Sequence, residues 1–220
     1  MGKNKLQHFA ELDTFEHVIQ FMYSEEDYDH PLKGKWNTDF FKNDQPITLE
    51  VGCGKGEYTV GLAKIHPDRN YIGLDLKGNR MWRGAKTALE DGMNNVGFLR
   101  TQADRILNFF APGELAEIWV TFPDPKPKKG NARKRLTSKE SSERYKQLLQ
   151  PGGLVHLKTD SDFNYQFTLD TIRENNYEIV RNSNDIDRDF PDDELVKIRT
   201  YYEMMFRAKG FPIKLVSYLP

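Results

Sequence analysis

From about residue 47 onward, short apolar runs alternate with segments of helical periodicity, and turn residues separate them. Strict alternation of this kind requires crossover connections between the strands. We therefore expect an α/β chain with a mostly parallel sheet covered by helices on both faces. The predicted strands are residues 47–51, 71–74, 96–99, 117–122 and 154–157, and the predicted helices are residues 58–65, 81–89, 104–110 and a segment that Thr137 or Ser138 caps and that ends at residue 149.

Length and composition restrict the class of protein. The chain has 220 residues, 38% of them hydrophobic, and no apolar run approaches the roughly 20 residues that span a bilayer. Cys53 is the only cysteine and the five histidines lack metal-ligand spacing, so we expect no internal disulfide and no metal site. No apolar segment follows the first lysines, as a secretory signal would require. These features favour a cytoplasmic protein without a membrane segment.

Positive and negative charges are separated along the chain. Lysine and arginine total 32 against 33 acidic residues, so the net charge is −1. Residues 11–29 contain seven acids and no base, whereas residues 125–139 contain seven bases and no acid. Overall neutrality argues against a nucleic-acid partner, but the basic segment supplies the local positive surface that such a partner needs. A solvated charged loop is the simpler alternative for this run.

A glycine-rich turn follows the first predicted strand. Its pattern is E-x-G-x-G-x-G, with Glu50 followed by Gly52, Gly54 and Gly56. A phosphate-binding P-loop needs G-x-x-x-x-G-K-[ST], which this turn does not have, and a dinucleotide fingerprint needs a third glycine where Glu57 stands. A carboxylate beside the turn disfavours a phosphate and favours a cationic ligand.

Acidic residues also follow the next two predicted strands. Asp75 is placed to accept both hydroxyls of a ribose, and Asp104 is placed to accept from the amino group of an adenine. S-adenosyl-L-methionine carries a sulfonium, an ammonium and a ribose diol but no phosphate, so it fits this series of groups. The glycine turn, Asp75 and Asp104 therefore predict a site for S-adenosyl-L-methionine at the carboxyl ends of the strands.

The segment after the fourth predicted strand combines a rigid turn with positive charge. Pro123 and Pro125 flank Asp124 and restrict its backbone, which suits a carboxylate that must face a ligand. Lys128 and residues 133–135 follow directly, and the phosphates of a polynucleotide are a natural partner for such a cluster.

These segments resemble those of the tRNA (guanine-N7)-methyltransferase family, and the resemblance extends from about residue 49 to the C-terminus. Two places depart from the central motif of the family. Lys126 stands where tryptophan is usual, and Gly130-Asn131 stands where Arg-His is usual. The matching segments are L-E-V-G-C-G-K-G (49–56), Y-I-G-L-D (71–75), A-D (103–104), F-P-D-P-K-P-K-K-G-N-A-R-K-R-L (122–136), K-T-D (158–160) and T-Y-Y-E-M-M-F-R-A-K-G (200–210).

The resemblance implies a fold and a domain organisation. We expect a Rossmann-like, class I methyltransferase domain over residues 46–220, with a mostly parallel seven-stranded sheet and helices on both faces. A strand near residues 201–206 would run antiparallel at the far side of the sheet. Outside the resemblance, the residues themselves indicate that residues 1–45 form a short polar and aromatic N-terminal extension, with a helix over residues 14–23.

The resemblance also implies an activity, the transfer of a methyl group from S-adenosyl-L-methionine to N7 of the guanine at position 46, in the variable loop of tRNA. N7 carries a free lone pair, so a general base is unnecessary, and Asp124 would be the catalytic residue through positioning and charge stabilisation. The implied cofactor contacts are Glu50, Gly52, Gly54, Asp75, Asp104 and Asp124. The implied tRNA contacts are Lys128, Arg133, Lys134, Arg135, Asp160, Thr200 and Glu203.

Two other functions remain open from the residues alone. The chain can be a methyltransferase for a small molecule whose basic loop is merely solvated, or an inactive RNA-binding module. Steep salt dependence of RNA binding separates the first alternative from a tRNA enzyme, and methyl transfer to tRNA separates the second. We expect a partner tRNA and a monomer or homodimer.

Overall fold

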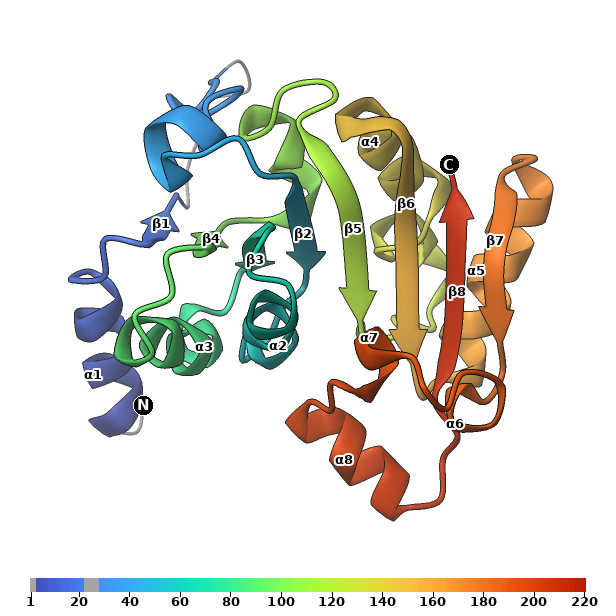
Figure 1. The fold of residues 1–220 in the computed structure, drawn as a ribbon. Helices are drawn as coiled ribbons and strands as arrows, with labels where there is room; N and C mark the ends of the chain where they lie inside the picture. Colours follow the sequence, from blue (N-terminus) through green and yellow to red (C-terminus); the bar gives the residue numbers. More distant parts are fainter. Residues whose placement is uncertain (1–2, 22–27) are drawn as a thin grey trace. The chain divides into compact units, whose positions relative to one another are not determined.

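The computed structural model describes residues 3–21 and 28–220, and the chain divides into two compact units. The first unit spans Met1–Ala111 and the second spans Pro112–Pro220. Figure 1 follows the elements of both in colour along the chain. Among the helices of the described part, none has both the length and the apolar character that a bilayer crossing needs.

The first unit contains parallel strands in the order β1-β4-β3-β2. All five residues of β2 are buried, as expected for a strand covered on both faces. The register places Gly73 of β3 beside both Glu50 and Phe98 of its neighbouring strands. The strands are β1 (Val18–Gln20), β2 (Ile47–Val51), β3 (Asn70–Asp75) and β4 (Val96–Arg100).

Helical segments connect these strands, and one of them anchors the residues that precede β2. The indole of Trp36 is fully buried, donates from Nε1 to the carbonyl of Phe109 at 2.8 Å, and stacks on Phe110. The helical segments are α1 (Lys3–Leu12), the π-helical turn η1 (Trp36–Phe41), α2 (Glu57–Ile65), α3 (Gly78–Glu90) and the 3₁₀ helix η2 (Ala103–Asn108).

The second unit has strands in the order β5-β6-β8-β7, with β5 and β6 parallel and β8 antiparallel to both of its neighbours. Ser138 caps α4 by accepting from the amide of Ser141, which confirms one of the two predicted caps. The elements are β5 (Leu115–Thr121), η3 (Lys129–Lys134), α4 (Lys139–Leu148), β6 (Leu149–Thr159), α5 (Asp162–Glu174), β7 (Glu178–Ser183), α6 (Ile186–Asp189), α7 (Glu194–Lys197), α8 (Tyr201–Ala208) and β8 (Lys214–Leu219).

Side chains on β8 and β6 show that helices cover both faces of this unit. The hydroxyl of Tyr218 contacts that of Ser142 on α4 at 2.8 Å. Its neighbour Ser217 points to the opposite face and contacts His156 at 2.7 Å. Lys158, two residues further along β6 on that face, pairs with Glu203 on α8. The α/β class with a mostly parallel sheet is therefore confirmed.

Three details of the predicted fold were wrong. The described residues form eight strands and not seven, because residues 18–20 of the N-terminal extension add β1 beside β4. A helix was predicted over residues 14–23, but β1 occupies part of that range and residues 22–23 lie outside the described part. The α-helix of the extension is α1, which lies earlier in the chain. Residues 201–206 lie in α8 because Thr200 caps a helix there, and the antiparallel strand is β8.

Two glycines allow the turn after β2 to approach α3 closely. Gly56 has φ of +70°, and a Cβ on it would lie 2.6 Å from Cε1 of Phe98 and 3.2 Å from Cα of Gly84. A Cβ on Gly84 would in turn lie 2.6 Å from the carbonyl oxygen of Lys55. Gly54 also has a positive φ of +55°, but a Cβ there would meet nothing within 4 Å. Gly56 is therefore required by packing, whereas Gly54 faces open space.

This difference predicts unequal effects of two matched substitutions. Gly56→Ala should lower the free energy of unfolding by about 3 kcal/mol, because it adds steric overlap to the strain of a left-handed backbone. Gly54→Ala should cost only about 1 kcal/mol, from backbone strain alone. Urea unfolding followed by circular dichroism measures both values, and equal losses would contradict the packing role of Gly56.

Candidate functional site

The glycine turn and the end of β3 are joined by backbone hydrogen bonds. The amides of Gly52 and Cys53 both donate to the carbonyl of Leu74, at 2.7 and 3.0 Å. The amide of Gly54 donates to Oδ2 of Asp75 at 2.9 Å, and the amide of Lys77 donates to Oδ1 at 2.7 Å. The structure therefore brings together the glycines and the acid that were expected to hold the cofactor. It also fixes the Asp75 carboxylate in one orientation.

Glu50 lies beneath this turn and is 2% exposed. Its Oε2 accepts from the amide of Thr59 at 2.9 Å and from the hydroxyl of the same residue. Thr59 lies in the first turn of α2, where free amides and the helix dipole stabilise a negative charge. Burial, together with the carboxylates of Glu50 and Asp75, raises the pKa of the Cys53 thiol well above its usual value. Cys53 is therefore a poor nucleophile, and the turn has a negative electrostatic environment.

The third acid of the series, Asp104, is exposed in η2, which follows β4. Leu76 directly follows Asp75 and is 43% exposed, which is unusual for a large apolar side chain. Leu76 was not among the residues expected at the site. Its position next to Asp75 could have indicated such a role. A ribose was expected at Asp75, and the purine base attached to that ribose needs an apolar surface to pack on.

The first unit therefore fits a cationic nucleoside ligand. Gly54 offers a backbone surface with no neighbouring atom where a Cβ would stand. Glu50 and Asp75 supply negative charge, which suits a sulfonium and an ammonium and repels a phosphate. Asp75 oxygens that already accept one amide each retain a further lone pair for a hydroxyl. These groups match the chemistry of S-adenosyl-L-methionine.

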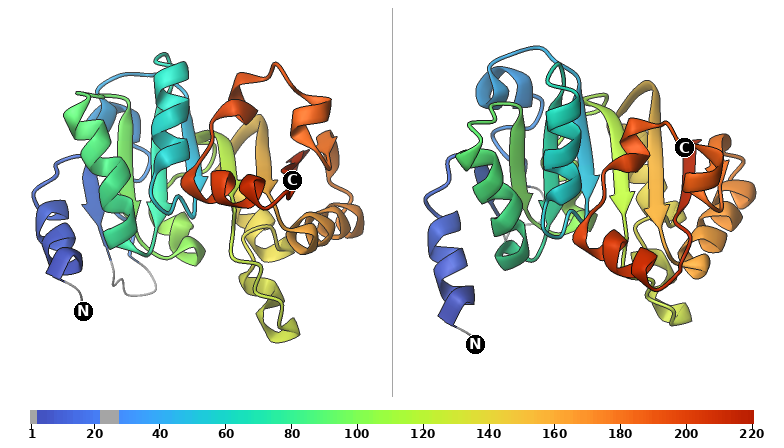
Figure 2. Two further views of the ribbon diagram at one scale, coloured as in Figure 1. Left: turned by 90° about the horizontal axis from the view of Figure 1, so that it is seen from below. Right: turned by 60° about the horizontal axis from the view of Figure 1, so that its bottom comes forward.

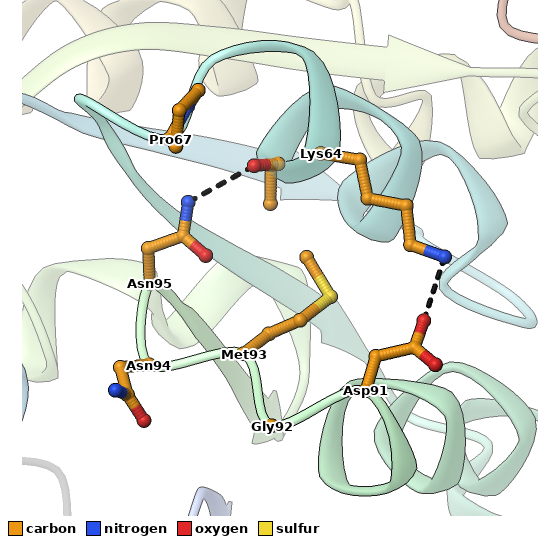
Figure 3. Close-up of a pocket in the computed structure, with 8 residues that line it drawn as sticks. Lys64, Pro67, Asp91, Gly92, Met93, Asn94 and Asn95 are labelled. Carbon is orange, nitrogen blue, oxygen red and sulfur yellow. Dashed lines mark hydrogen bonds and ion pairs between the residues drawn. The ribbon is translucent and has the colours of Figure 1, made fainter.

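A hollow of about 450 Å³ lies elsewhere in the same unit, and Figure 3 shows its lining. Lys64 and Asp91 form an ion pair across it at 2.6 Å, and Asn95 donates to the carbonyl of Ala63 at 3.1 Å. Asn95 directly precedes β4, so the hollow lies at the amino ends of the strands. Ligands of parallel sheets bind at the opposite, carboxyl ends, so this hollow is separate from the candidate site.

In the second unit, the turn that carries Asp124 is held firmly while Asp124 itself is exposed. Phe122 adopts a positive φ of 47°, and its amide donates to the carbonyl of Lys158 at 2.8 Å. The side-chain amide of Asn164 donates to the carbonyl of Pro123 at 2.8 Å. These bonds tie the turn to the end of β6 and to α5. They support the predicted rigidity of the turn with contacts that the sequence did not reveal.

Arg135 organises the basic loop from within. Its side chain is buried, and its guanidinium donates to the carbonyl of Lys126 at 3.1 and 3.3 Å. The guanidinium carbon lies 4.7 Å from the ring centroid of Phe163 and 4.3 Å from that of Phe167. Arg135 was expected to contact tRNA, but its charged group is engaged inside the protein. We therefore assign it to the shape of the loop.

The remaining bases of the loop are exposed on η3 and its flanks. Lys128, Lys129 and Lys134 are exposed, and Arg133 is exposed while it pairs with Glu140 at 3.1 Å. Figure 2 shows η3 projecting from the body of the second unit. These residues form the positive surface that the charge pattern predicted.

Glu203 and Lys158 form a buried ion pair. Both side chains are 0% exposed, and Nζ of Lys158 lies 2.8 Å from Oε2 of Glu203. The same ammonium donates to the carbonyls of Val196 at 3.0 Å and Ile198 at 2.8 Å, so its three protons all have acceptors. Burial lowers the pKa of Lys158, and the Glu203 carboxylate opposes this effect. Lys158 thus ties the segment that precedes α8 to the end of β6.

The other residues expected to contact tRNA in this region differ in exposure. Thr200 is buried and caps α8 through a bond from the Glu203 amide at 3.2 Å. Asp160, two residues after Lys158, is half-buried, and burial raises the pKa of its carboxyl group. Of the acids that were expected at the site in this unit, Asp124 and Asp160 remain open to a ligand, whereas Glu203, together with Thr200, builds the helix beside them.

The buried ion pair predicts a characteristic pattern of stabilities. Lys158→Met should lower the free energy of unfolding by about 3 kcal/mol, because the buried Glu203 carboxylate loses one of its two cationic partners. Arg207 is the partner that remains. The double variant Lys158→Met/Glu203→Leu should be more stable than the single variant, because no buried charge is left unpaired. Chemical unfolding of the wild type and the two variants tests this order, and a double variant less stable than Lys158→Met would contradict it.

Comparison with known proteins agrees with this geometry. The model of a family described as "Putative methyltransferase" matches residues 44–216. A tRNA (guanine-N(7)-)-methyltransferase of Bacteroides fragilis (strain YCH46) is 48% identical over 220 residues, which cover 100% of this chain and 86% of the relative. The protein of the same name from Christiangramia forsetii is 48% identical over 219 residues, which cover 99% of this chain and 98% of the relative.

Among solved structures, the 16S rRNA methyltransferase KamB is similar in fold, with a TM-score of 0.62 at 16% identity over 82% of this chain and 90% of that one. At that identity the likeness supports the methyltransferase fold and nothing finer. The full-length relatives carry the family assignment: the chain belongs to the tRNA (guanine-N(7)-)-methyltransferases.

Proposed function

We propose that this protein transfers a methyl group from S-adenosyl-L-methionine to N7 of a guanine in tRNA, at position 46 of the variable loop, in the cytoplasm. The observation that carries the proposal is full-length similarity to relatives named for that reaction. It is supported independently by the chemistry of the two units, one with carboxylates around a glycine turn and the other with an exposed acid beside a basic loop.

The cofactor would be held by groups of the first unit. S-adenosyl-L-methionine, when bound, supplies a methyl group that its sulfonium has already activated for transfer. Asp75 would accept the ribose hydroxyls, with Leu76 as the apolar neighbour of the base and Asp104 as acceptor for the adenine amino group. Gly52 and Gly54 would let the backbone approach the ligand, and Glu50 would supply negative charge from below the turn.

The guanine would be held by acids of the second unit. N7 is an acceptor with a free lone pair, so it needs no deprotonation before it attacks a methyl group. The N1–H and amino group of guanine are donors, and the carboxylates of Asp124 and Asp160 are suitable acceptors for them. A carboxylate near the ring also stabilises the positive charge that the purine gains on methylation. Asp124 is our candidate catalytic residue, because its turn is rigid while its side chain is exposed.

The tRNA backbone would be bound by the exposed bases around η3. Lys128, Lys129, Arg133 and Lys134 offer charge to phosphates, and contacts of this kind supply most of the sequence-independent affinity. The departures from the family motif fall in this loop. Lys126, in place of tryptophan, donates from Nζ to the carbonyl of Lys134 and so closes the loop internally.

Removal of the Asp124 carboxylate tests the chemical proposal. Asp124→Ala should reduce kcat for labelled methyl transfer to tRNA about 100-fold, because an acceptor that orients the base and stabilises its charge is lost. Asp192→Ala, at an exposed acid of the same unit, is the matched control and should be unaffected. Cleavage of the product by aniline at a single guanine would identify the N7 position. Activity of Asp124→Ala within about threefold of wild type would remove Asp124 from the mechanism.

Salt dependence tests whether the substrate is a polynucleotide. Lys128→Ala should make the fall of log affinity for tRNA with log salt concentration shallower by about 0.7 to 0.9, because one phosphate contact is lost. Lys64→Ala is the control, because its ammonium is already paired with Asp91, and it should leave the slope unchanged. A flat salt dependence of the wild-type protein would favour the small-molecule methyltransferase. Steep binding without methyl transfer would favour the inactive RNA-binding module.

A further inference from the structure

The N-terminal helix α1 docks on α3 through specific contacts, and Figure 1 shows the two helices next to each other. The ring of His8 stacks on that of Trp82 with centroids 3.8 Å apart and planes 4° from parallel. Oε2 of Glu11 accepts from the indole Nε1 of Trp82 at 2.8 Å and pairs with Lys86 at 3.3 Å. These contacts fix the position of the helix on the first unit.

Phe9 on the same helix contacts Arg100, which is the last residue of β4. The guanidinium carbon of Arg100 lies 4.5 Å from the ring centroid of Phe9. Its Nη1 donates to Oε1 of Gln20, at the end of β1, at 2.8 Å. Its Nε donates to the carbonyl of Leu76 through a long bond of 3.4 Å. Arg100 therefore joins α1 and β1 of the N-terminal extension to the residue that follows Asp75.

The register and one glycine make this arrangement possible. Asp75 and Arg100 are direct neighbours across β3 and β4, so the arginine side chain starts beside the predicted ribose acceptor. Gly78 begins α3, and a Cβ on it would lie 2.8 Å from Cδ of Arg100 and 3.0 Å from Cε1 of Phe9. Absence of a side chain at residue 78 therefore gives Arg100 and Phe9 the space that they share.

We propose that Arg100 is a positioning residue for the cofactor-binding groups of the first unit, which are the glycine turn and Asp75. We further propose that α1 holds Arg100 in place through Phe9. The proposal rests on the proposed binding of S-adenosyl-L-methionine by Asp75. Arg100 supports the turn over residues 75–77 from outside, by binding the Leu76 carbonyl, while the Gly54 amide supports the Asp75 carboxylate from inside. Residues of the N-terminal extension thereby contribute to cofactor affinity without touching the cofactor.

Binding of S-adenosyl-L-homocysteine, measured by calorimetry on the full-length protein, tests the proposal without relying on activity. Arg100→Met and Phe9→Ala should each weaken binding about fivefold to tenfold, because the turn loses its outer support. The double variant should be no weaker than Arg100→Met alone, since Phe9 acts through the arginine. Arg83→Met is the matched control and should bind normally, because the contacts described for that guanidinium, with Trp82, Thr87 and Glu90, all lie within α3.

Two outcomes would overturn the proposal. One is affinity within twofold of wild type for both single variants, whatever the loss in thermal stability. The other is multiplicative weakening in the double variant, which would show two independent effects.

The variant Asp75→Ala distinguishes a failure of this proposal about Arg100 from a failure of the proposed function. If Asp75→Ala abolishes binding while the other variants bind normally, only the role of Arg100 fails. If Asp75→Ala also binds normally, the proposed binding of the cofactor by Asp75 is itself wrong.

Discussion

Glu50 places a carboxylate almost completely out of water at the end of β2, and its bonds to Thr59 make that placement stable. A buried charge without such partners would be costly, so the first turn of α2 has to begin where it does. The glycine turn must then pass between the strand and the helix in very few residues. The positive φ values of Gly52, Gly54 and Gly56 follow from that constraint. The shape of the glycine turn in the first unit thus follows from the position of the buried Glu50 carboxylate.

Local patterns predicted most of the fold, and contacts between distant segments account for the errors. Apolar runs ending in glycine or aspartate located β2 and β3 almost to the residue, because both are parallel strands that are buried except for Asp75 at the end of β3. Residues 201–206 were expected to form a strand because the resemblance implied an antiparallel strand in that part of the chain. The T-x-x-E spacing of Thr200 and Glu203 is a helix-capping signature and was the better signal. β1 has only three residues and is defined by its pairing with β4, which no local pattern reveals.

The candidate site was predictable where residue type alone determines the chemistry. Glycines at a strand end and Asp75 after the next strand were found together as expected. Charged residues of the second unit were harder to assign, because the sequence does not show which charges the fold uses itself. Glu203 is neutralised by Lys158, which is distant in sequence, and Arg135 is enclosed by two aromatic rings. A charge that a protein uses for its own packing looks the same, in a sequence, as one reserved for a ligand.

Enclosure of Arg135 also affects how the basic loop meets a polyanion. A loop of many like charges would normally be a loose chain, and ordering it on contact would consume part of the binding free energy. Here an internal cation, bonded to the Lys126 carbonyl, does the ordering before any partner arrives. Added salt screens exposed charges strongly but screens the interactions of a buried charge much less. The loop should therefore keep its shape at ionic strengths that release its ligand, so that binding and folding of this segment are separate events.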